Sequence, residues 1–251
     1  MNLLKVENLN LWYGKKHVLK DINFELREKE ILCIVGESGS GKSSILLCIM
    51  RILPSNSKVK GKIVFEGKNI LTLKEREIKN IRSSKISIVF QEPSSYLDPL
   101  FTVGSQIAET VSSHLKVSDV KRYVIDKMKE AGIPDAERRY NSYPHQLSGG
   151  LKQRICITNA IACNPKIVLA DEPTTALDVS VQKRILALFR NLKNKGTSLI
   201  LVTHDFGVVA ECADRVIVLK EGEIIEEASV FEIFDNPKDP YTKMLIESAF
   251  N

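Results

Sequence analysis

The sequence lacks long apolar runs and carries no strong net charge. Its longest apolar stretches, such as Ile31–Val35 and Leu199–Val202, are far shorter than the about 20 residues that a helix needs to cross a bilayer. This argues against a membrane-spanning chain, and no basic segment followed by an apolar stretch marks a signal peptide at the N-terminus. The 36 basic and 31 acidic residues leave a net charge of only +5, without a dense basic patch, so we expect no nucleic-acid partner.

Cysteine is also scarce. The chain has five, at positions 33, 48, 156, 163 and 212, and no two of them form a CxxC pair. An odd number at these spacings fits neither a disulfide framework nor a zinc or iron–sulfur site. We therefore expect reduced thiols in the core of a cytosolic protein.

Short apolar runs, typical of buried strands, alternate with stretches of helical periodicity. The runs are Ile31–Val35, Ile86–Phe90, Ile167–Ala170 and Leu199–Thr203. Three of them precede apparent helices, one of which covers Val181–Leu192, and this order predicts a parallel sheet with crossover helices.

Other segments predict a second, antiparallel sheet. Arg215–Leu219 and Glu223–Glu227 flank a short turn that contains glycine, which indicates a hairpin. We interpret Leu3–Leu9, Ile22–Leu26 and Lys62–Phe65 as further strands of the same sheet.

A helical region lies between the predicted strands. Apolar residues recur there every four positions, at Ile107, Val111 and Leu115 and again at Val120, Val124 and Met128. This predicts two helices, the second capped by Ser118 and ended by Gly132. We interpret residues 1–251 as a single domain, with a helical subdomain at about 94–155 inserted in an α/β core.

The most specific motif is a loop of the form GxxxxGK(S/T) between a predicted strand and the helical segment Ser44–Arg51. It consists of Gly36, Glu37, Ser38, Gly39, Ser40, Gly41, Lys42 and Ser43. Glycines let backbone N–H groups converge on phosphate oxygens, and the helix N-terminus adds positive potential. Lys42 is expected to reach the β- and γ-phosphates of a nucleotide, and the Ser43 hydroxyl to bind Mg²⁺.

Two acidic residues, Asp171 and Glu172, follow the apolar run Ile167–Ala170. Ligands gather at the carboxyl ends of parallel strands. Asp171 is therefore expected to hold the coordination shell of the metal ion. Glu172 is a candidate general base for an attacking water.

A third motif carries a family resemblance. Leu147–Arg154 reads LSGGLKQR, which resembles the LSGGQ signature of ATP-binding cassette (ABC) ATPases. Trp12–Gly14 resembles the aromatic A-loop of that family, Phe90–Glu92 the Q-loop, Thr175–Asp178 the D-loop and Thr203–Asp205 the switch-histidine region. The resemblance implies an ABC ATPase fold: a P-loop NTPase parallel-sheet core, an antiparallel β subdomain and an α-helical signature subdomain.

The resemblance also implies roles in the binding and hydrolysis of ATP. Tyr13 would stack on adenine, and Ser44 would be the last of the residues that bind the nucleotide through the glycine-rich loop. Gln91 would touch Mg²⁺ and water, and His204 would bind the γ-phosphate and help to orient the water. With Glu172 and His204 both present, the subunit is expected to be catalytically complete.

Other implied roles lie at a subunit boundary. Ser148, Gly149 and Gly150 would contact an ATP held by the opposite subunit, and Asp178 would bridge the two subunits. The implied partners are a second ABC ATPase subunit in a head-to-tail dimer, for which the resemblance favours a paralogue, and two membrane permease subunits. An extracytoplasmic substrate-binding protein would act indirectly. The chain would be peripheral, on the cytoplasmic face of the cell membrane.

A narrower resemblance concerns the cargo. Gln91–Leu100, Tyr143–Leu147 and Asn236–Thr242 are similar to importer ATPases for oligopeptides, dipeptides and nickel. Many peptide members continue with a Cys-rich extension that this sequence lacks, which slightly favours nickel or a metallophore. Leu151 replaces the glutamine of the signature, as in many relatives of this branch, and is not interpreted as inactivating.

Several alternatives stay open. Trp12 could replace Tyr13 as the adenine platform. The stripe of Ile107 and Val111 either packs internally or docks a membrane subunit, and the resemblance favours docking for this subdomain. A soluble ABC-type ATPase that acts on nucleic acid or the ribosome is a competing function, and so is a regulatory module without turnover.

Overall fold

The computed structural model describes residues 2–175 and 177–250. The chain divides into two compact units. Unit 1 combines Met1–Ile78 with Phe189–Asn251, and unit 2 is Lys79–Leu188. Within the described residues, no helix has the length and apolar character needed to traverse a bilayer.

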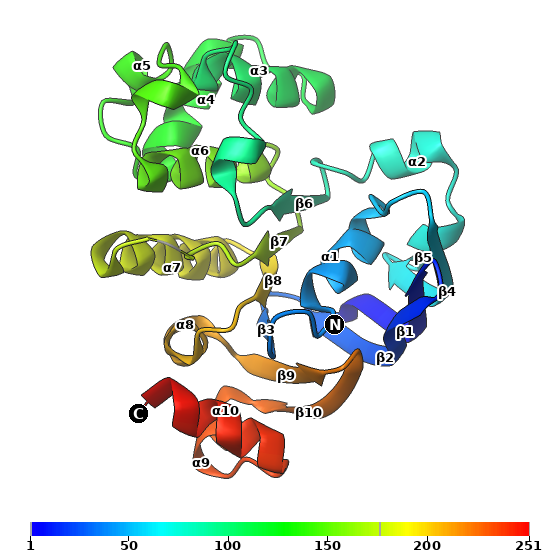
Figure 1. Ribbon diagram of the computed structural model, residues 1–251. Coiled ribbons are helices and arrows are strands. Elements are labelled where there is room, and N and C mark those ends of the chain that lie inside the picture. The colour runs from blue at the N-terminus through cyan, green and yellow to red at the C-terminus, as the bar shows by residue number, and fades with distance from the viewer. Residues whose placement is uncertain (1, 176, 251) are drawn as a thin grey trace. The chain divides into compact units, whose positions relative to one another are not determined.

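Most strands belong to unit 1. They are β1 (Asn2–Tyr13), β2 (Lys16–Arg27), β3 (Ile31–Val35), β4 (Ser57–Phe65), β5 (Lys68–Asn69), β8 (Ser198–Val202), β9 (Arg215–Lys220) and β10 (Glu223–Ser229) (Figure 1). Its helices are α1 (Lys42–Met50), α8 (Phe206–Cys212), α9 (Val230–Asp235) and α10 (Pro240–Phe250), and α2 (Glu75–Lys79) spans the boundary to unit 2.

The antiparallel sheet of unit 1 has the strand order β2-β1-β4-β5. The three predicted strands are confirmed as parts of β1, β2 and β4, which are longer than predicted. In β1 the buried side chains change phase, from Leu4 and Val6 to Leu9 and Leu11. The pairing with β2 shifts register between Val6 and Leu9, where Asn8 has φ +47°. This bulge inserts one residue and so keeps both apolar pairs on the core side.

The second sheet of unit 1 places β3 between β8 and β9, both parallel to it, with β10 antiparallel to β9. The predicted hairpin therefore forms, but the prediction that it joins the antiparallel sheet of β1 and β2 is wrong. Val216–Leu219 is completely buried, as is usual for strands of a parallel sheet that is covered on both faces. The hairpin turn is local, whereas the pairing of β9 with β3 joins residues far apart in sequence.

Unit 2 contains the parallel pair β6 (Ile86–Val89) and β7 (Ile167–Asp171). Its helices are α3 (Val103–His114), α4 (Val120–Glu130), α5 (Ala136–Arg139), α6 (Gly149–Ile161) and most of α7 (Val179–Asn194), which runs on into unit 1 (Figure 1). The two predicted helices are confirmed as α3 and α4. The N-cap of α4 is Asp119 rather than Ser118, because the Asp119 carboxylate accepts the N–H of Arg122 at 2.9 Å.

The apolar stripes of α3 and α4 form the core of this helical region, where α3 packs on α4 and α6. Ile107, Val111, Val124 and Met128 are all fully buried. Ile107 and Val111 therefore serve internal packing, and a membrane subunit that docked on this region would have to contact other residues.

The five cysteines are free thiols. Cys33, Cys48, Cys163 and Cys212 are buried, and Cys156 is partly exposed. Burial raises the pKa of Cys48 and of Cys156 to about 12, so both thiols stay protonated at neutral pH.

Candidate nucleotide-binding site

The glycine-rich loop of unit 1 joins the carboxyl end of β3 to the first turn of α1. Gly36 has φ +151°, and a Cβ added there would lie 2.1 Å from the carbonyl oxygen of Leu219. No side chain fits at this close approach of two backbone segments, which explains why the loop begins with glycine. At the other end of the loop, Gly41 caps α1 in a left-handed conformation.

Lys42 lies inside this loop and is only 5% exposed. Its ammonium group donates to the carbonyl oxygens of Gly36 and Glu37, both at 2.8 Å. No acidic residue occupies the first turn of α1, so the helix N-terminus keeps its positive potential. The loop thus has the charge and the exposed backbone of an anion-binding cradle, with Glu37, Ser38, Gly39 and Ser43 open to solvent.

The two aromatic residues at the end of β1 have different surroundings. The Trp12 ring stacks on His17, with 4.3 Å between ring centroids. The Tyr13 hydroxyl donates to the Ser44 hydroxyl on α1 at 3.3 Å. Successive residues of a strand point to opposite faces, so Tyr13 is the aromatic residue on the side of the glycine-rich loop.

His204 follows β8 in unit 1 and is exposed. The next residue, Asp205, caps α8: its carboxylate accepts the N–H groups of Gly207 and Val208 at 2.7 and 3.3 Å. The N–H of Asp205 in turn donates to the Thr203 hydroxyl at 3.0 Å. The cap fixes the backbone on both sides of His204 and leaves its imidazole at the surface.

In unit 2, the structure brings Gln91 and Glu172 into direct contact. The Gln91 side-chain amide donates to Glu172 Oε2 at 2.9 Å, and the Thr175 hydroxyl donates to the same oxygen at 2.9 Å. Glu172 has φ +43°, a left-handed conformation that is uncommon outside glycine and concentrates at functional sites. Thr175 is not predicted as a partner of Glu172 from the sequence, although a hydroxyl three residues after a carboxylate at a strand end is a usable signal.

Asp171 ends β7 and is half-buried. Desolvation raises the pKa of the Tyr96 phenol, and the negative charge of the Asp171 carboxylate raises it further. The Tyr96 ring stacks on Phe90, with 3.9 Å between centroids. Amide and carboxylate oxygens suit Mg²⁺, and within unit 2 Gln91 and Asp171 would offer one of each. Because the Gln91 amide nitrogen is bound to Glu172, its amide oxygen is the atom left for a metal.

The signature segment opens α6 in unit 2. Ser148 is the N-cap residue, but its exposed hydroxyl makes no capping bond to the helix. A Cβ added at Gly149 would meet no described atom within 4 Å, whereas a Cβ on Gly150 would lie 2.9 Å from Cγ1 of Val181. A hydroxyl without a capping bond and the first N–H groups of a helix are donors that can bind an anion.

Asp178 has a local role in unit 2. Its carboxylate accepts the N–H of Val181 at 2.9 Å and so caps the first turn of α7. The residue is exposed. Ala176, in the same predicted D-loop, lies outside the described residues.

A cavity of about 390 Å³ joins three of the predicted motifs of unit 2. Its lining includes Gln91 of the Q-loop, Gly149 of the signature and Thr175 and Leu177 of the D-loop. These motifs lie far apart in sequence, and their convergence supports a shared function.

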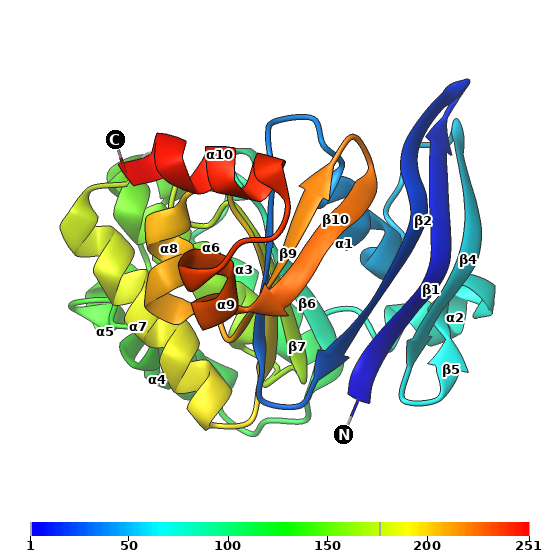
Figure 2. The same cartoon turned by 90° about the horizontal axis from the view of Figure 1, so that it is seen from below.

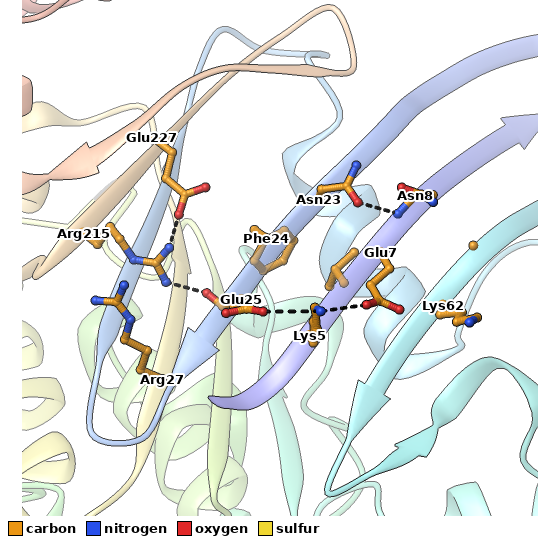
Figure 3. A pocket seen from close by; sticks show the side chains of 12 residues that line it. Lys5, Glu7, Asn8, Asn23, Phe24, Glu25, Arg27, Lys62, Arg215 and Glu227 are labelled. Carbon is orange, nitrogen blue, oxygen red and sulfur yellow. Dashed lines mark hydrogen bonds and ion pairs between the residues drawn. The ribbon is translucent and has the colours of Figure 1, made fainter. Parts of the chain in front are cut away.

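A larger depression, of about 820 Å³, lies in unit 1 beside β1, β2 and β10 (Figure 3). Lys5 pairs there with Glu7 at 2.8 Å, and Arg215 pairs with Glu227 (Figure 3). None of the residues predicted to bind nucleotide lines it.

Comparisons with known proteins agree with these motifs. The family described as ABC transporter matches residues 19–175 of this chain. The oligopeptide transport ATP-binding protein OppD of Bacillus subtilis is 44% identical over 255 residues, which cover 98% of this chain and 71% of OppD. The dipeptide transport ATP-binding protein DppD of Haemophilus influenzae is 42% identical over 256 residues, 99% of this chain and 78% of DppD.

Two solved structures share the fold. The ATP-binding cassette MJ0796, in a dimeric post-hydrolysis state bound to ADP and Pi, has a TM-score of 0.80 and 32% identity, covering 90% of this chain and 98% of its own. CbiO1 of Clostridium perfringens, part of the cbiONQ transporter complex, has a TM-score of 0.81 and 33% identity, covering 94% and 91%. Both confirm the predicted fold class.

Proposed function

Since the chain belongs to the ABC transporter family, as an ATPase that hydrolyses ATP to drive transport, we propose that it powers an importer of peptides. The ATPase part of this proposal rests on the glycine-rich loop of Gly36–Ser43, closed around the buried Lys42. Such a loop is an anion cradle, and the family places the phosphates of ATP on it.

In unit 1, we assign Gly36–Ser44 to phosphate binding. Lys42 would exchange its bonds to two loop carbonyls for bonds to the β- and γ-phosphates. Tyr13 is assigned to adenine, because its hydroxyl lies at 3.3 Å from Ser44 on the helix that follows the loop. His204 is assigned to the γ-phosphate, since Asp205 holds its backbone and leaves its ring exposed.

In unit 2, we assign Glu172 as the general base that takes a proton from the attacking water. Gln91 and Thr175 orient its carboxylate through two hydrogen bonds of 2.9 Å. Asp171, Gln91 and Ser43 would hold Mg²⁺, which supplies charge neutralisation for the phosphates. Ser148, Gly149 and Gly150 are assigned to an ATP held by another subunit, and Asp178 to the bridge between subunits.

These assignments imply an assembly. We propose a head-to-tail dimer with a second ABC ATPase, for which the importer resemblance favours a paralogue. The Ser148 hydroxyl, which makes no capping bond, and the exposed Asp178 support this dimer. The chain would act as one ABC ATPase domain, with the helical subdomain at about 94–155 in its α/β core. Two membrane permease subunits would place it peripherally on the cytoplasmic face, and an extracytoplasmic binding protein would deliver the cargo.

For the cargo, we propose peptides rather than nickel. OppD and DppD, which match nearly the whole chain, are named for oligopeptide and dipeptide transport. This similarity outweighs the slight preference for nickel that rests on the length of the sequence.

The test is purification of the native membrane complex through a tag on this chain. Its ATPase rate is then measured with short peptides, with nickel and with chelated nickel. We expect membrane subunits to co-purify and peptides to stimulate hydrolysis. Stimulation by nickel species alone would refute the peptide assignment, and absence of any membrane subunit would refute the importer.

A further inference from the structure

The segment that leads into α10 is anchored to β10 of the same unit. Glu226 on β10 is 8% exposed, and its carboxylate accepts the backbone N–H groups of Lys238 at 2.8 Å and of Asp239 at 3.1 Å. Burial alone would raise the pKa of Glu226, but these donors hold it below the ordinary value. The carboxylate is therefore ionised at neutral pH and ties residues 238 and 239 to the sheet.

This anchor fixes the start of α10, where Tyr241 lies. The Tyr241 ring is 8% exposed, and the ammonium group of Lys220 lies 4.7 Å from its centroid. The neighbouring Thr242 is fully buried. The aromatic ring is thus held by packing and by a cation–π contact that does not depend on its hydroxyl.

The Tyr241 hydroxyl reaches the glycine-rich loop. It accepts the backbone N–H of Glu37 at 3.2 Å. Glu37 is an exposed loop residue whose carbonyl also receives the Lys42 ammonium, so one peptide segment is held from two sides. Figure 2 shows α10, in red, beside the β9–β10 hairpin.

The hairpin holds the same loop at two more places. The N–H of Gly222, in the β9–β10 turn, donates to the carbonyl oxygen of Ser40 at 3.0 Å. The carbonyl of Leu219 lies against Gly36, where a Cβ would not fit. Leu219, Gly222 and Tyr241 therefore hold the loop at three of its residues. These three holding residues lie outside the family match of 19–175.

We propose that Tyr241 is a positioning residue for nucleotide binding, which sets the conformation of the glycine-rich loop through its bond to the Glu37 N–H. This inference rests on the proposed binding of phosphates by Gly36–Ser43. A loop that must present several N–H groups to one anion loses conformational entropy on binding, and a tether from a rigid ring removes part of that loss beforehand. The hydroxyl acts on the binding loop, so its loss weakens ATP affinity rather than turnover.

The test is Tyr241→Phe in the full chain, which removes the hydroxyl and keeps the ring over Lys220. The Kd for ATP is measured on the purified chain, and KM and kcat on the transporter complex. We expect Kd and KM to rise about threefold to tenfold, the equivalent of one hydrogen bond, with kcat within about twofold of wild type. The matched control is Tyr123→Phe, which removes a hydroxyl that donates to the Ala162 carbonyl at 2.8 Å in unit 2.

Wild-type Kd and KM in Tyr241→Phe would overturn the inference. So would a lower Tm with unchanged Kd, because that result describes a structural bond only. Lys42→Ala separates this failure from failure of the loop assignment. If Lys42→Ala loses ATP affinity while Tyr241→Phe keeps it, the role of Tyr241 is refuted and the phosphate-binding role of the loop is kept. If Lys42→Ala binds ATP as wild type does, both the phosphate-binding role of the loop and the role of Tyr241 are refuted.

Discussion

Thr175 offers a direct test of how the proposed base is oriented. Its hydroxyl donates to Glu172 Oε2 at 2.9 Å, and the Gln91 amide donates to the same oxygen. Thr175→Val keeps the branched shape and removes the donor. Hydrogen bonds to charged groups contribute about 1.5–3 kcal/mol when buried. Thr175 is exposed, so water replaces part of the bond, and we expect a loss of about 0.5–1.4 kcal/mol.

That loss corresponds to a fall in kcat of about twofold to tenfold. The assay is ATP hydrolysis by the transporter complex at saturating ATP and Mg²⁺, with KM measured alongside. We expect KM to stay near wild type, because the Thr175 hydroxyl bonds to the carboxylate of the proposed base. The control is Thr175→Ser, which retains the hydroxyl and should retain kcat. Wild-type kcat in Thr175→Val, or an equal loss in Thr175→Ser, would refute the reasoning.

Three further predictions follow from single contacts. Glu172→Gln should lower kcat by about 10²–10⁴ while the Kd for ATP is retained, and full hydrolysis by this variant would eliminate Glu172 as the base. In urea unfolding, Gly149→Ala should leave the free energy of unfolding unchanged or raise it by up to about 1 kcal/mol, whereas Gly150→Ala should lower it by about 1 kcal/mol because the added Cβ meets Val181. A second substitution, Val181→Ala, should relieve that loss. Equal stability of the Gly149→Ala and Gly150→Ala variants would contradict the contact. Because the pKa of Glu226 is depressed in the folded chain, its carboxylate stabilises the fold above the ordinary pKa of 4.5, and this stabilisation is lost as the pH falls below that value. The difference in unfolding free energy between wild type and Glu226→Gln should therefore shrink on acidification. A difference that does not change with pH would show that the carboxylate charge is not involved.

Much of the proposed site could be predicted from sequence because its parts are local. The glycine-rich loop, the carboxylates at the end of β7 and the signature at the start of α6 are short segments whose chemistry depends on neighbouring residues. The strand Ile31–Val35 is predicted with its observed bounds, since five consecutive apolar residues between a charged residue and a glycine are typical of a short buried strand.

The family, the ATPase chemistry and the class of fold can thus be inferred from the order of residues alone. Tertiary packing sets which sheet takes the β9–β10 hairpin, turns Ile107 and Val111 inward, and brings Thr175 and Gln91 to one oxygen of Glu172. It also placed Tyr241 on Glu37, a pair 204 residues apart. Such pairings depend on packing between segments distant in the chain, and a local pattern of residue types carries no record of which distant partner it will meet.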